Sequence, residues 1–186
     1  IKEVSFGNDG NISKTKLEDV INSDLANNFG NLCQRVTAFN EKNCSSLVPL
    51  KDSFTEDDLK ILNNFSNNIK TIRNEIDKQN LNFYMDFIIN ALFDANKYFN
   101  DQEPWKKKTN PKRLNTIVYT SLEVIRKICF MIYPIIPDSS LKALKIFNLN
   151  ENDIKFSSIE NHDFLLPGAK INKIEILFKK IEKNND

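Results

Sequence analysis

The residues of this chain best suited to bind another molecule are an asparagine, an arginine and a tryptophan. Asn31 and Arg35 are four residues apart in a segment with helical periodicity, which separates them by about 40° around the helix axis. Both side chains can therefore reach one external object, and their forked donors and acceptors match the edges of nucleic-acid bases. The spacing alone is explained more simply by local pairing of Arg35 with Asp24 or Glu41.

The tryptophan stands beside a proline and a run of cations. Trp105, the only tryptophan, follows Pro104 and precedes Lys106, Lys107 and Lys108. A flat ring next to cations at the end of a helix can stack on a planar, anionic partner such as nucleic acid. A ring that caps the hydrophobic core beside a solvated lysine run explains the same residues. The three lysines are candidate contacts to RNA phosphates, and a solvated run is equally consistent with them.

Composition restricts the class of protein. The chain has 186 residues, of which 40% are hydrophobic and four are glycine, so we expect one globular domain with one core. No stretch approaches the roughly 20 apolar residues of a membrane helix, and the N-terminus lacks the order of a signal peptide. We expect a cytoplasmic protein that does not contact membranes. Because the chain starts at Ile1 and not at a methionine, we expect it to be a piece of a longer protein.

Catalysis and metal binding are not expected in this segment. Cys33, Cys44 and Cys129 lack the close spacing of zinc ligands, so we expect reduced, buried thiols. His162 is the only histidine, which argues against a histidine-based triad or a multi-histidine metal site. With 26 basic and 25 acidic residues, the net charge is +1. Any nucleic-acid contact is therefore expected to be a local patch, which disfavours sequence-blind binding of DNA.

Apolar residues at three-to-four-residue spacing predict two helices in the first part of the chain. The first spans about residues 14–43, is capped by Ser13, and has a break in its periodicity near Phe29. The second follows Thr55, which forms a predicted capping box with Asp58. The buried stripe of the first helix is expected to comprise Leu17, Ile21, Leu25, Leu32, Val36 and Phe39.

Three further helices are predicted in the remaining sequence. The third spans about residues 81–99, and the fourth begins at Pro111 with Asn110 as its cap. A short fifth helix begins at Asp138 or Ser139. Four long helices joined by loops of about 5 to 12 residues can each bury one stripe in a shared core. The predicted fold is an all-α antiparallel helix bundle of four long helices plus a short fifth.

The C-terminal part of the chain has a different pattern. Helical periodicity fades after about residue 150. We therefore assign residues 13–150 to the bundle and residues 151–186 to an extended tail. This tail is expected to pack on the bundle or on a missing neighbour.

Four sequence segments resemble one protein family. Residues 21–35 (INSDLANNFGNLCQR) are similar to the start of the anticodon-binding domain of bacterial-type methionyl-tRNA synthetase, a class I aminoacyl-tRNA synthetase. Residues 3–10 resemble the stretch that leads out of that family's catalytic core, residues 95–105 resemble its helix-exit motif, and residues 177–182 resemble its closing segment. The four segments occur in the family's order and span nearly the whole chain, so the chain is identified as a member of this family.

The resemblance implies a function and a site. In this family the helix asparagine and arginine and the tryptophan after proline recognise the CAU anticodon, with the tryptophan stacking on its first base. By motif position these residues are Asn31, Arg35 and Trp105. The implied partners are the anticodon loop of tRNA(Met) and the parent enzyme's own catalytic core, to which residues 1–12 would connect. The implied parent is a methionine-tRNA ligase that uses ATP with Mg, while this segment alone would be inactive and hold no cofactor.

Some features depart from the family or suggest other functions. Lys179 stands where the family often has proline, which puts docking of the tail in doubt. Residues 11–15 (NISKT) superficially resemble the activation loop of class I synthetases, but they follow the core-exit segment, and Ser13 is better explained as a helix cap. Two alternatives stay open: the anticodon domain of a related class I synthetase, and a helical protein-interaction module in which Trp105 anchors a partner.

Overall fold

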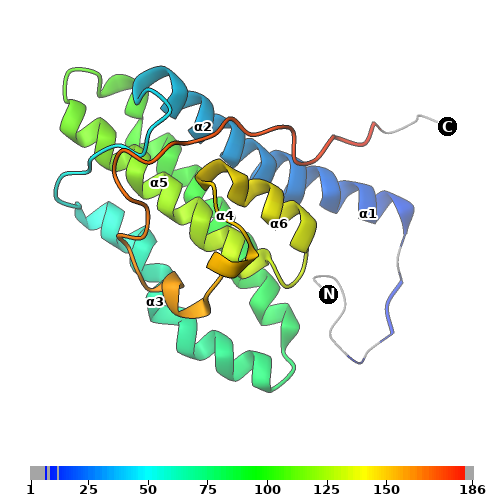
Figure 1. Cartoon of the computed structure of the whole chain (residues 1–186). Coiled ribbons are helices and arrows are strands. Elements are labelled where there is room, and N and C mark those ends of the chain that lie inside the picture. The colour runs from blue at the N-terminus through cyan, green and yellow to red at the C-terminus, as the bar shows by residue number, and fades with distance from the viewer. Residues whose placement is uncertain (1–6, 8, 12, 183–186) are drawn as a thin grey trace.

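The protein is a bundle of helices in the predicted all-α class. The computed structural model describes residue 7, residues 9–11 and residues 13–182; most of the expected connector, residues 1–6, 8 and 12, lies outside the described part of the chain. Helices α3, α4 and α5 lie at the centre, and each runs antiparallel to the one before it in the chain (Figure 1). The α-helices are α1 (Lys14–Val20), α2 (Asn31–Asn43), α3 (Glu56–Asp77), α4 (Leu81–Gln102), α5 (Pro111–Ile132) and α6 (Pro137–Leu144).

The first predicted helix is continuous but changes its winding. Helix α1, a π-helical segment from Ile21 to Gly30, and α2 follow one another with helical backbone angles at both junctions. Ser13 caps this helix as predicted, because its hydroxyl accepts a 3.1 Å hydrogen bond from the Lys16 N–H. A π-helix holds more residues per turn than an α-helix. The π-helical segment therefore accounts for the break in periodicity near Phe29, whose side chain is fully buried.

One part of the predicted stripe is wrong. Leu17 is 54% exposed, and α1 contains no buried residue. Helix α1 projects beyond the end of the bundle (Figure 1). Apolar periodicity indicates which face of a helix is apolar, but at this end no described helix packs against that face.

The predicted helix caps are confirmed at α3 and α5. The carboxylate of Asp58 accepts a 2.8 Å hydrogen bond from the Thr55 N–H, which completes the capping box at α3. At α5 the Asn110 side chain accepts a 3.2 Å hydrogen bond from the Arg113 N–H, and Pro111 is the first helical residue.

Two helix boundaries differ from the prediction. Helix α4 continues to Gln102, three residues beyond residue 99. Helix α6 begins at Pro137, one residue before the predicted Asp138. Proline is well suited to the first helical position because it lacks an N–H that would have no partner there.

Helix α5 is the centre of the core. It contacts α2, α3, α4 and α6, and Ile117, Leu122 and Ile128 on it are fully buried. Burying each such side chain contributes roughly 1.5–3 kcal/mol. The same helix also buries three charged residues completely: Glu123, Arg126 and Lys127. Charges in such a position require partners, because an unpaired buried charge is costly.

The C-terminal tail supplies many of these partners. Glu123 accepts hydrogen bonds from the Arg126 Nε at 2.8 Å and from the Leu165 N–H at 2.6 Å. Arg126 Nη2 donates to the backbone carbonyls of Ser158 and Asn161 at 3.2 and 3.1 Å. Residues 158–165 of the tail therefore contact α5, and this part includes a short 3₁₀ turn and is not fully extended.

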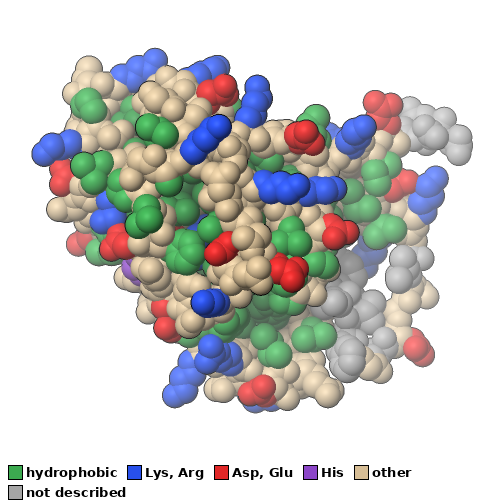
Figure 2. Space-filling model, viewed as in Figure 1, with side chains coloured by type: hydrophobic (Ala, Val, Ile, Leu, Met, Phe, Trp, Pro, Cys, Tyr) green, Lys and Arg blue, Asp and Glu red, His purple; other side chains and the backbone are tan. Residues whose placement is uncertain are grey.

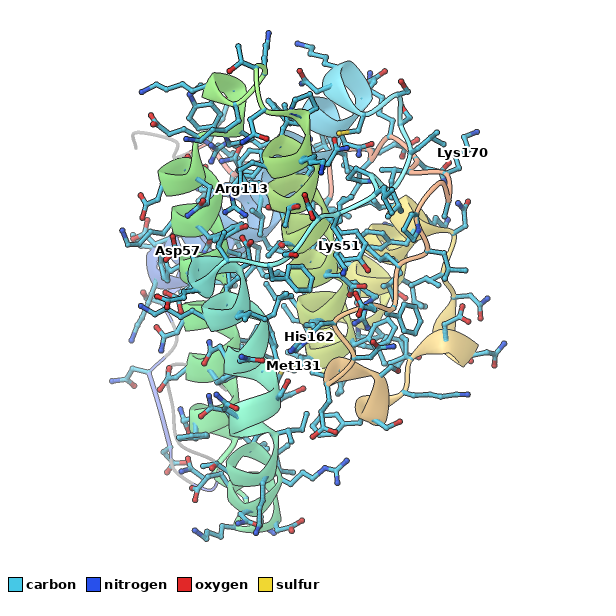
Figure 3. All side chains as sticks on the ribbon, turned by 90° about the vertical axis from the view of Figure 1, so that its left-hand side faces the viewer. Lys51, Asp57, Arg113, Met131, His162 and Lys170 are labelled. Carbon is cyan, nitrogen blue, oxygen red and sulfur yellow. The ribbon has the colours of Figure 1, made fainter. Side chains whose placement is uncertain are left out.

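Lys127 and His162 extend the same network to α3. Lys127 Nζ donates to the carbonyl oxygens of Ile159 and Asn161 and lies 3.2 Å from His162 Nδ1. His162 lies between α5 and α3 (Figure 3), and its Nε2 is 2.9 Å from the side-chain oxygen of Asn63. Burial lowers the pKa of Lys127 to about 7. While Lys127 is an ammonium it only donates, so Nδ1 accepts and Nε2 carries the proton. Burial, and secondly the charge of Lys127, lower the pKa of His162 below 6.5.

We predict that stability falls as the pH drops below about 6.5 and that His162 contributes to this loss. Its pKa is lower in the folded than in the unfolded state, so the unfolded chain binds the proton first and acid favours unfolding. In His162→Gln the amide oxygen can accept from Lys127 and the amide nitrogen can donate to Asn63 without titrating. Urea unfolding at about pH 5.5 and about pH 7.5 should show a smaller loss in the variant. Equal losses would contradict the assigned role of His162.

Candidate nucleic-acid interface

A short turn at the end of α4 presents Trp105. After Gln102, the residue Glu103 adopts a left-handed backbone conformation with φ of +44°. Residues Pro104–Lys106 then form a 3₁₀ turn in which Pro104 is buried and Trp105 is 41% exposed. A left-handed backbone at a residue other than glycine costs about 1–3 kcal/mol and persists only where surrounding contacts hold it.

Contacts from two other helices hold this end of α4. The side-chain nitrogen of Gln102 donates to Asp57 on α3 at 2.9 Å, and its side-chain oxygen accepts from Arg113 Nη2 on α5 at 2.5 Å. Asp57 and Arg113 lie near the same end of the bundle (Figure 3). The residue that precedes the turn is therefore fixed from both sides.

Arg113 also pairs with a buried carboxylate. Its two terminal nitrogens donate to the two oxygens of Asp58 at 2.5 and 3.0 Å, and Asp58 is fully buried. The Tyr98 hydroxyl donates to the same carboxylate. Burial raises the pKa of Asp58, but the hydrogen bonds from Arg113, Tyr98 and the Thr55 N–H outweigh it and hold the pKa below the usual value. Asp58 is therefore an anion at neutral pH, and it joins α3, α4 and α5.

Arg35 and Trp105 meet at one aromatic ring. Arg35 Nη2 reaches from α2 to α4, where it donates to the Asn100 side-chain oxygen at 2.5 Å. Its guanidinium carbon is 5.6 Å from the centre of the Phe99 ring. The Phe99 ring packs against Trp105 with centroids 6.1 Å apart and planes at 70°. The structure thus brings together two of the three predicted site residues.

Phe99 and Asn100 are members of this site that sequence reasoning missed. Phe99 is nearly completely buried and looks like any other apolar residue of the α4 stripe. Asn100 is exposed and has no unusual neighbours in the sequence. Only the approach of α2 to α4 reveals their connection to Arg35.

Asn31 is exposed one turn before Arg35, as predicted, but it faces a groove of its own. The groove has a volume of about 470 Å³ and lies between the first helix and the tail. Asn31, Asn27 and Gln34 line it from the helix, and Phe178, Lys179 and Lys180 are among the residues that line it from the tail. The site therefore has two adjacent parts, one around Arg35 and Trp105 and one around Asn31.

The lysine run next to Trp105 is partly neutralised. Lys106 forms an ion pair with Glu103 at 2.7 Å. Lys107 is half-buried, and Lys108 is exposed. Basic and acidic side chains are interspersed over the face seen in Figure 2, as the net charge of +1 predicts.

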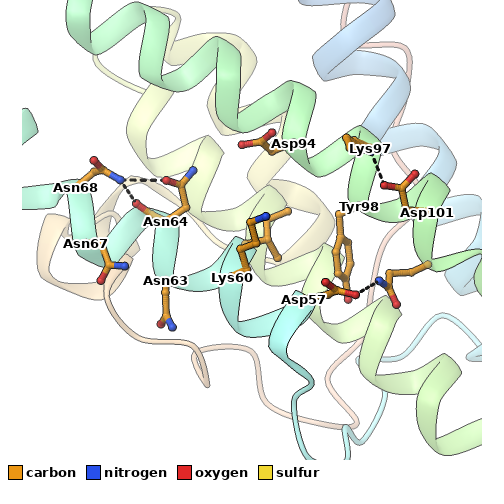
Figure 4. Close-up of a pocket in the computed structure, with 12 residues that line it drawn as sticks. Asp57, Lys60, Asn63, Asn64, Asn67, Asn68, Asp94, Lys97, Tyr98 and Asp101 are labelled. Atoms are coloured by element: carbon orange, nitrogen blue, oxygen red, sulfur yellow. Dashed lines mark hydrogen bonds and ion pairs between the residues drawn. The ribbon is translucent and has the colours of Figure 1, made fainter.

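A second groove, between α3 and α4, is acidic. It has a volume of about 490 Å³, and three carboxylates, Asp57, Asp94 and Asp101, line it together with Lys60 and Lys97 (Figure 4). Lys97 already pairs with Asp101 at 2.6 Å. Because the carboxylates outnumber the lysines, this groove is the less favourable of the two for an anionic polymer.

Two of the three cysteines are buried thiols, as predicted. Cys33 and Cys129 are fully buried, and burial raises the pKa of both thiols. Cys44 is only half-buried, and burial raises its pKa to about 11. Within the described part of the chain, no group of three histidine, cysteine, aspartate or glutamate side chains is placed to hold a metal ion. No helix in that part is long and apolar enough to span a bilayer.

Comparison with known proteins decides the family. A family model described as the anticodon binding domain of methionyl tRNA ligase matches residues 48–186. The chain belongs to this family. The predicted family membership is therefore confirmed, and the Trp105 turn is part of an anticodon-binding domain of methionyl-tRNA ligase.

Individual relatives agree with this assignment. The methionine–tRNA ligase of Brucella suis is 37% identical over 160 residues, which cover 86% of this chain and 31% of that protein. The enzyme of Thermotoga maritima is 35% identical over 184 residues, which cover 98% of this chain and 29% of that protein. The chain thus spans about a third of the length of these relatives.

A solved structure shows the same fold. The crystal structure of the apo form of Mycobacterium tuberculosis methionyl-tRNA synthetase superposes with a TM-score of 0.91 at 30% identity. The superposition covers 98% of this chain and 38% of that protein. The α1–α6 arrangement described above is therefore the arrangement of an anticodon-binding domain in this family.

We predict that Arg113→Met destabilises the anticodon-binding domain by about 3–5 kcal/mol, because the substitution leaves the fully buried Asp58 without its counter-ion. Chemical denaturation provides the free energy of unfolding. The double variant Arg113→Met, Asp58→Asn removes the buried charge and should recover part of the loss. A loss below about 1 kcal/mol in the single variant would show that the pair does not hold the three helices together.

Proposed function

We propose that this anticodon-binding domain recognises the CAU anticodon of tRNA(Met) through Asn31, Arg35 and Trp105. The observation that carries the proposal is the meeting of Arg35 and Trp105 at Phe99, with Asn31 exposed one helical turn away. Stacking of a base on an aromatic ring is worth about 1–3 kcal/mol and tolerates any base. Each bidentate pair of hydrogen bonds between a side chain and a base edge adds about 1–3 kcal/mol of discrimination between bases.

The local geometry favours a site that is ordered before RNA arrives. Asn100 engages one terminal nitrogen of Arg35, and the other donors of the guanidinium remain for a base. Pro104 limits the freedom of the turn, which lowers the entropy cost of holding the Trp105 ring in place. A site with a small ordering cost keeps more of its contact energy as affinity.

We extend the proposal to the longer protein. Its catalytic core would attach methionine to tRNA(Met) using ATP with Mg, and residues 1–12 would lead from that core into the bundle. The M. tuberculosis relative has been solved bound by methionyl-adenylate, which supports this chemistry for the parent. In this scheme the parent acts in the cytoplasm, while residues 13–150 read the anticodon and form no adenylate by themselves. A methionine-dependent exchange of pyrophosphate into ATP by the isolated chain would contradict the proposal that this chain forms no adenylate.

The first test is binding of a CAU anticodon stem-loop to site variants. We predict that Trp105→Ala and Arg35→Ala each weaken binding about 5-fold or more, as the loss of at least about 1 kcal/mol requires. Calorimetric titration at one fixed salt concentration measures the effect, because phosphate contacts depend on salt. Trp105→Phe keeps an aromatic surface and should bind more tightly than Trp105→Ala. Unchanged affinity in both alanine variants would exclude the proposed site.

The second test concerns the choice of RNA. We predict that Arg35→Ala reduces the preference for CAU over altered anticodons, because alanine has no forked donors for a base edge. Trp105→Ala should weaken the binding of all stem-loops by similar factors, because stacking carries little base specificity. Competition with a panel of stem-loops measures the effects of both variants on anticodon preference. A DNA copy of the CAU hairpin should compete poorly, because the proposed partner is RNA. Preference of the unmodified domain for another anticodon would contradict the proposed recognition of CAU.

A further inference from the structure

The C-terminal tail is fastened to the first helix on both sides of Lys179 and Lys180. On one side the Phe178 ring lies 6.2 Å from the Phe29 ring. On the other side the backbone N–H of Ile181 donates to the Asn22 side chain at 2.8 Å, and Asn22 donates back to the Ile181 carbonyl at 2.9 Å. The two lysines are therefore held on a fixed stretch of backbone beside the helix (Figure 1).

Gly30 on the first helix lies next to the docked Phe178 ring. A Cβ atom at Gly30 would lie 3.6 Å from the Phe178 ring and 3.3 Å from the Leu25 carbonyl oxygen. The distance to Phe178 is an ordinary van der Waals contact, and only the distance to Leu25, on the first helix itself, is tighter. The contacts that hold the tail here come from Phe178 and Ile181, the residues on either side of the two lysines.

The groove between this stretch and the helix is locally cationic. None of the eight residues that line it is acidic, and two of them are Lys179 and Lys180. Neither lysine forms an ion pair with any described residue, whereas Lys106 and Lys97 are each paired with a carboxylate. In a chain with a net charge of only +1, two such cations at one groove make a local site for an anion.

The cationic groove borders the proposed anticodon site at Asn31. Asn31 lines the groove and is one turn from Arg35, and Gln34, which precedes Arg35, lines it too. A nucleotide whose base is read at Asn31 and Arg35 has a phosphate on each side of its sugar. One of these phosphates has room in the groove, where lysines can neutralise it.

We infer that the tail is part of the RNA interface, with Lys179 and Lys180 contacting phosphates of the anticodon loop next to the nucleotide read at Asn31. The inference rests on the proposed function, since it assumes that the anticodon loop occupies the neighbouring site. It adds a third chain segment to the helix and the Trp105 turn. The lysines contribute affinity and position, and they leave base selectivity to the other two segments.

The test uses the double variant Lys179→Gln, Lys180→Gln with the CAU stem-loop. Affinity should fall about 3- to 10-fold at about 0.1 M salt, and the slope of log K against log salt should decrease by about 0.7 for each phosphate that a lysine no longer neutralises. The preference for CAU over altered anticodons should stay the same. The matched control is Lys70→Gln, Lys155→Gln, which changes the net charge equally at two exposed lysines outside the groove.

A third variant separates fixed contacts from general charge. Asn22→Ala keeps both lysines but removes the two hydrogen bonds to Ile181, so it should weaken RNA binding about 2- to 3-fold. Equal affinity and salt slope in the tail variant and its control would overturn the inference, while weaker binding by Trp105→Ala and Arg35→Ala would still uphold the anticodon site. If those two alanine variants bind like the unmodified domain, the proposed function itself fails.

Discussion

The buried carboxylate of Asp58 is the group on which the geometry of the proposed anticodon site depends. It accepts hydrogen bonds from the first residue of the α3 capping box, from Tyr98 on α4 and from Arg113 on α5. Moving such a charge out of water costs several kcal/mol, which only a complete set of donors offsets. The three helices must therefore adopt one relative position. Arg113 also donates a hydrogen bond to Gln102, the last residue of α4 before the turn that carries Trp105. The position of the turn therefore depends on the same ion pair.

A second buried network fixes the other part of the site through the tail. Glu123 and Arg126 on α5 bind the backbone of residues 158–165. Farther along, Val48 exchanges hydrogen bonds with the backbone of Gly168 and Ala169, both at 2.8 Å. The tail is thus tied to the bundle at several points before it reaches Asn22. Its last described residues take their position from the core, although they lie on the surface.

The sequence was sufficient for the helices and their caps because these features depend on neighbouring residues. Ser13, Thr55 and Asn110 satisfy backbone groups within one turn, so their roles are readable from spacing. Leu17 was assigned to the core wrongly, since a pattern shows an apolar face but not what covers it. For the site, spacing alone favoured ordinary surface roles, and only the resemblance selected Asn31, Arg35 and Trp105.

The remaining features could not be read from the sequence because they join distant segments. The hydrogen bond from Arg35 to Asn100 links residues 65 positions apart, and those between Asn22 and Ile181 link residues 159 positions apart. No local pattern distinguishes Asn22 or Asn100 from the many other asparagines of this chain. Their roles appear only once packing has placed the first helix against α4 and against the tail.

The position of the single tryptophan has a practical consequence. Indole emission from this chain comes from Trp105 alone, and that ring is 41% exposed and packed against Phe99. Any change in its intensity or wavelength therefore reports the environment of one turn and not an average over the molecule. The domain carries an intrinsic optical probe at the place where we propose that a base stacks, so occupancy of that place can be followed without attaching a dye.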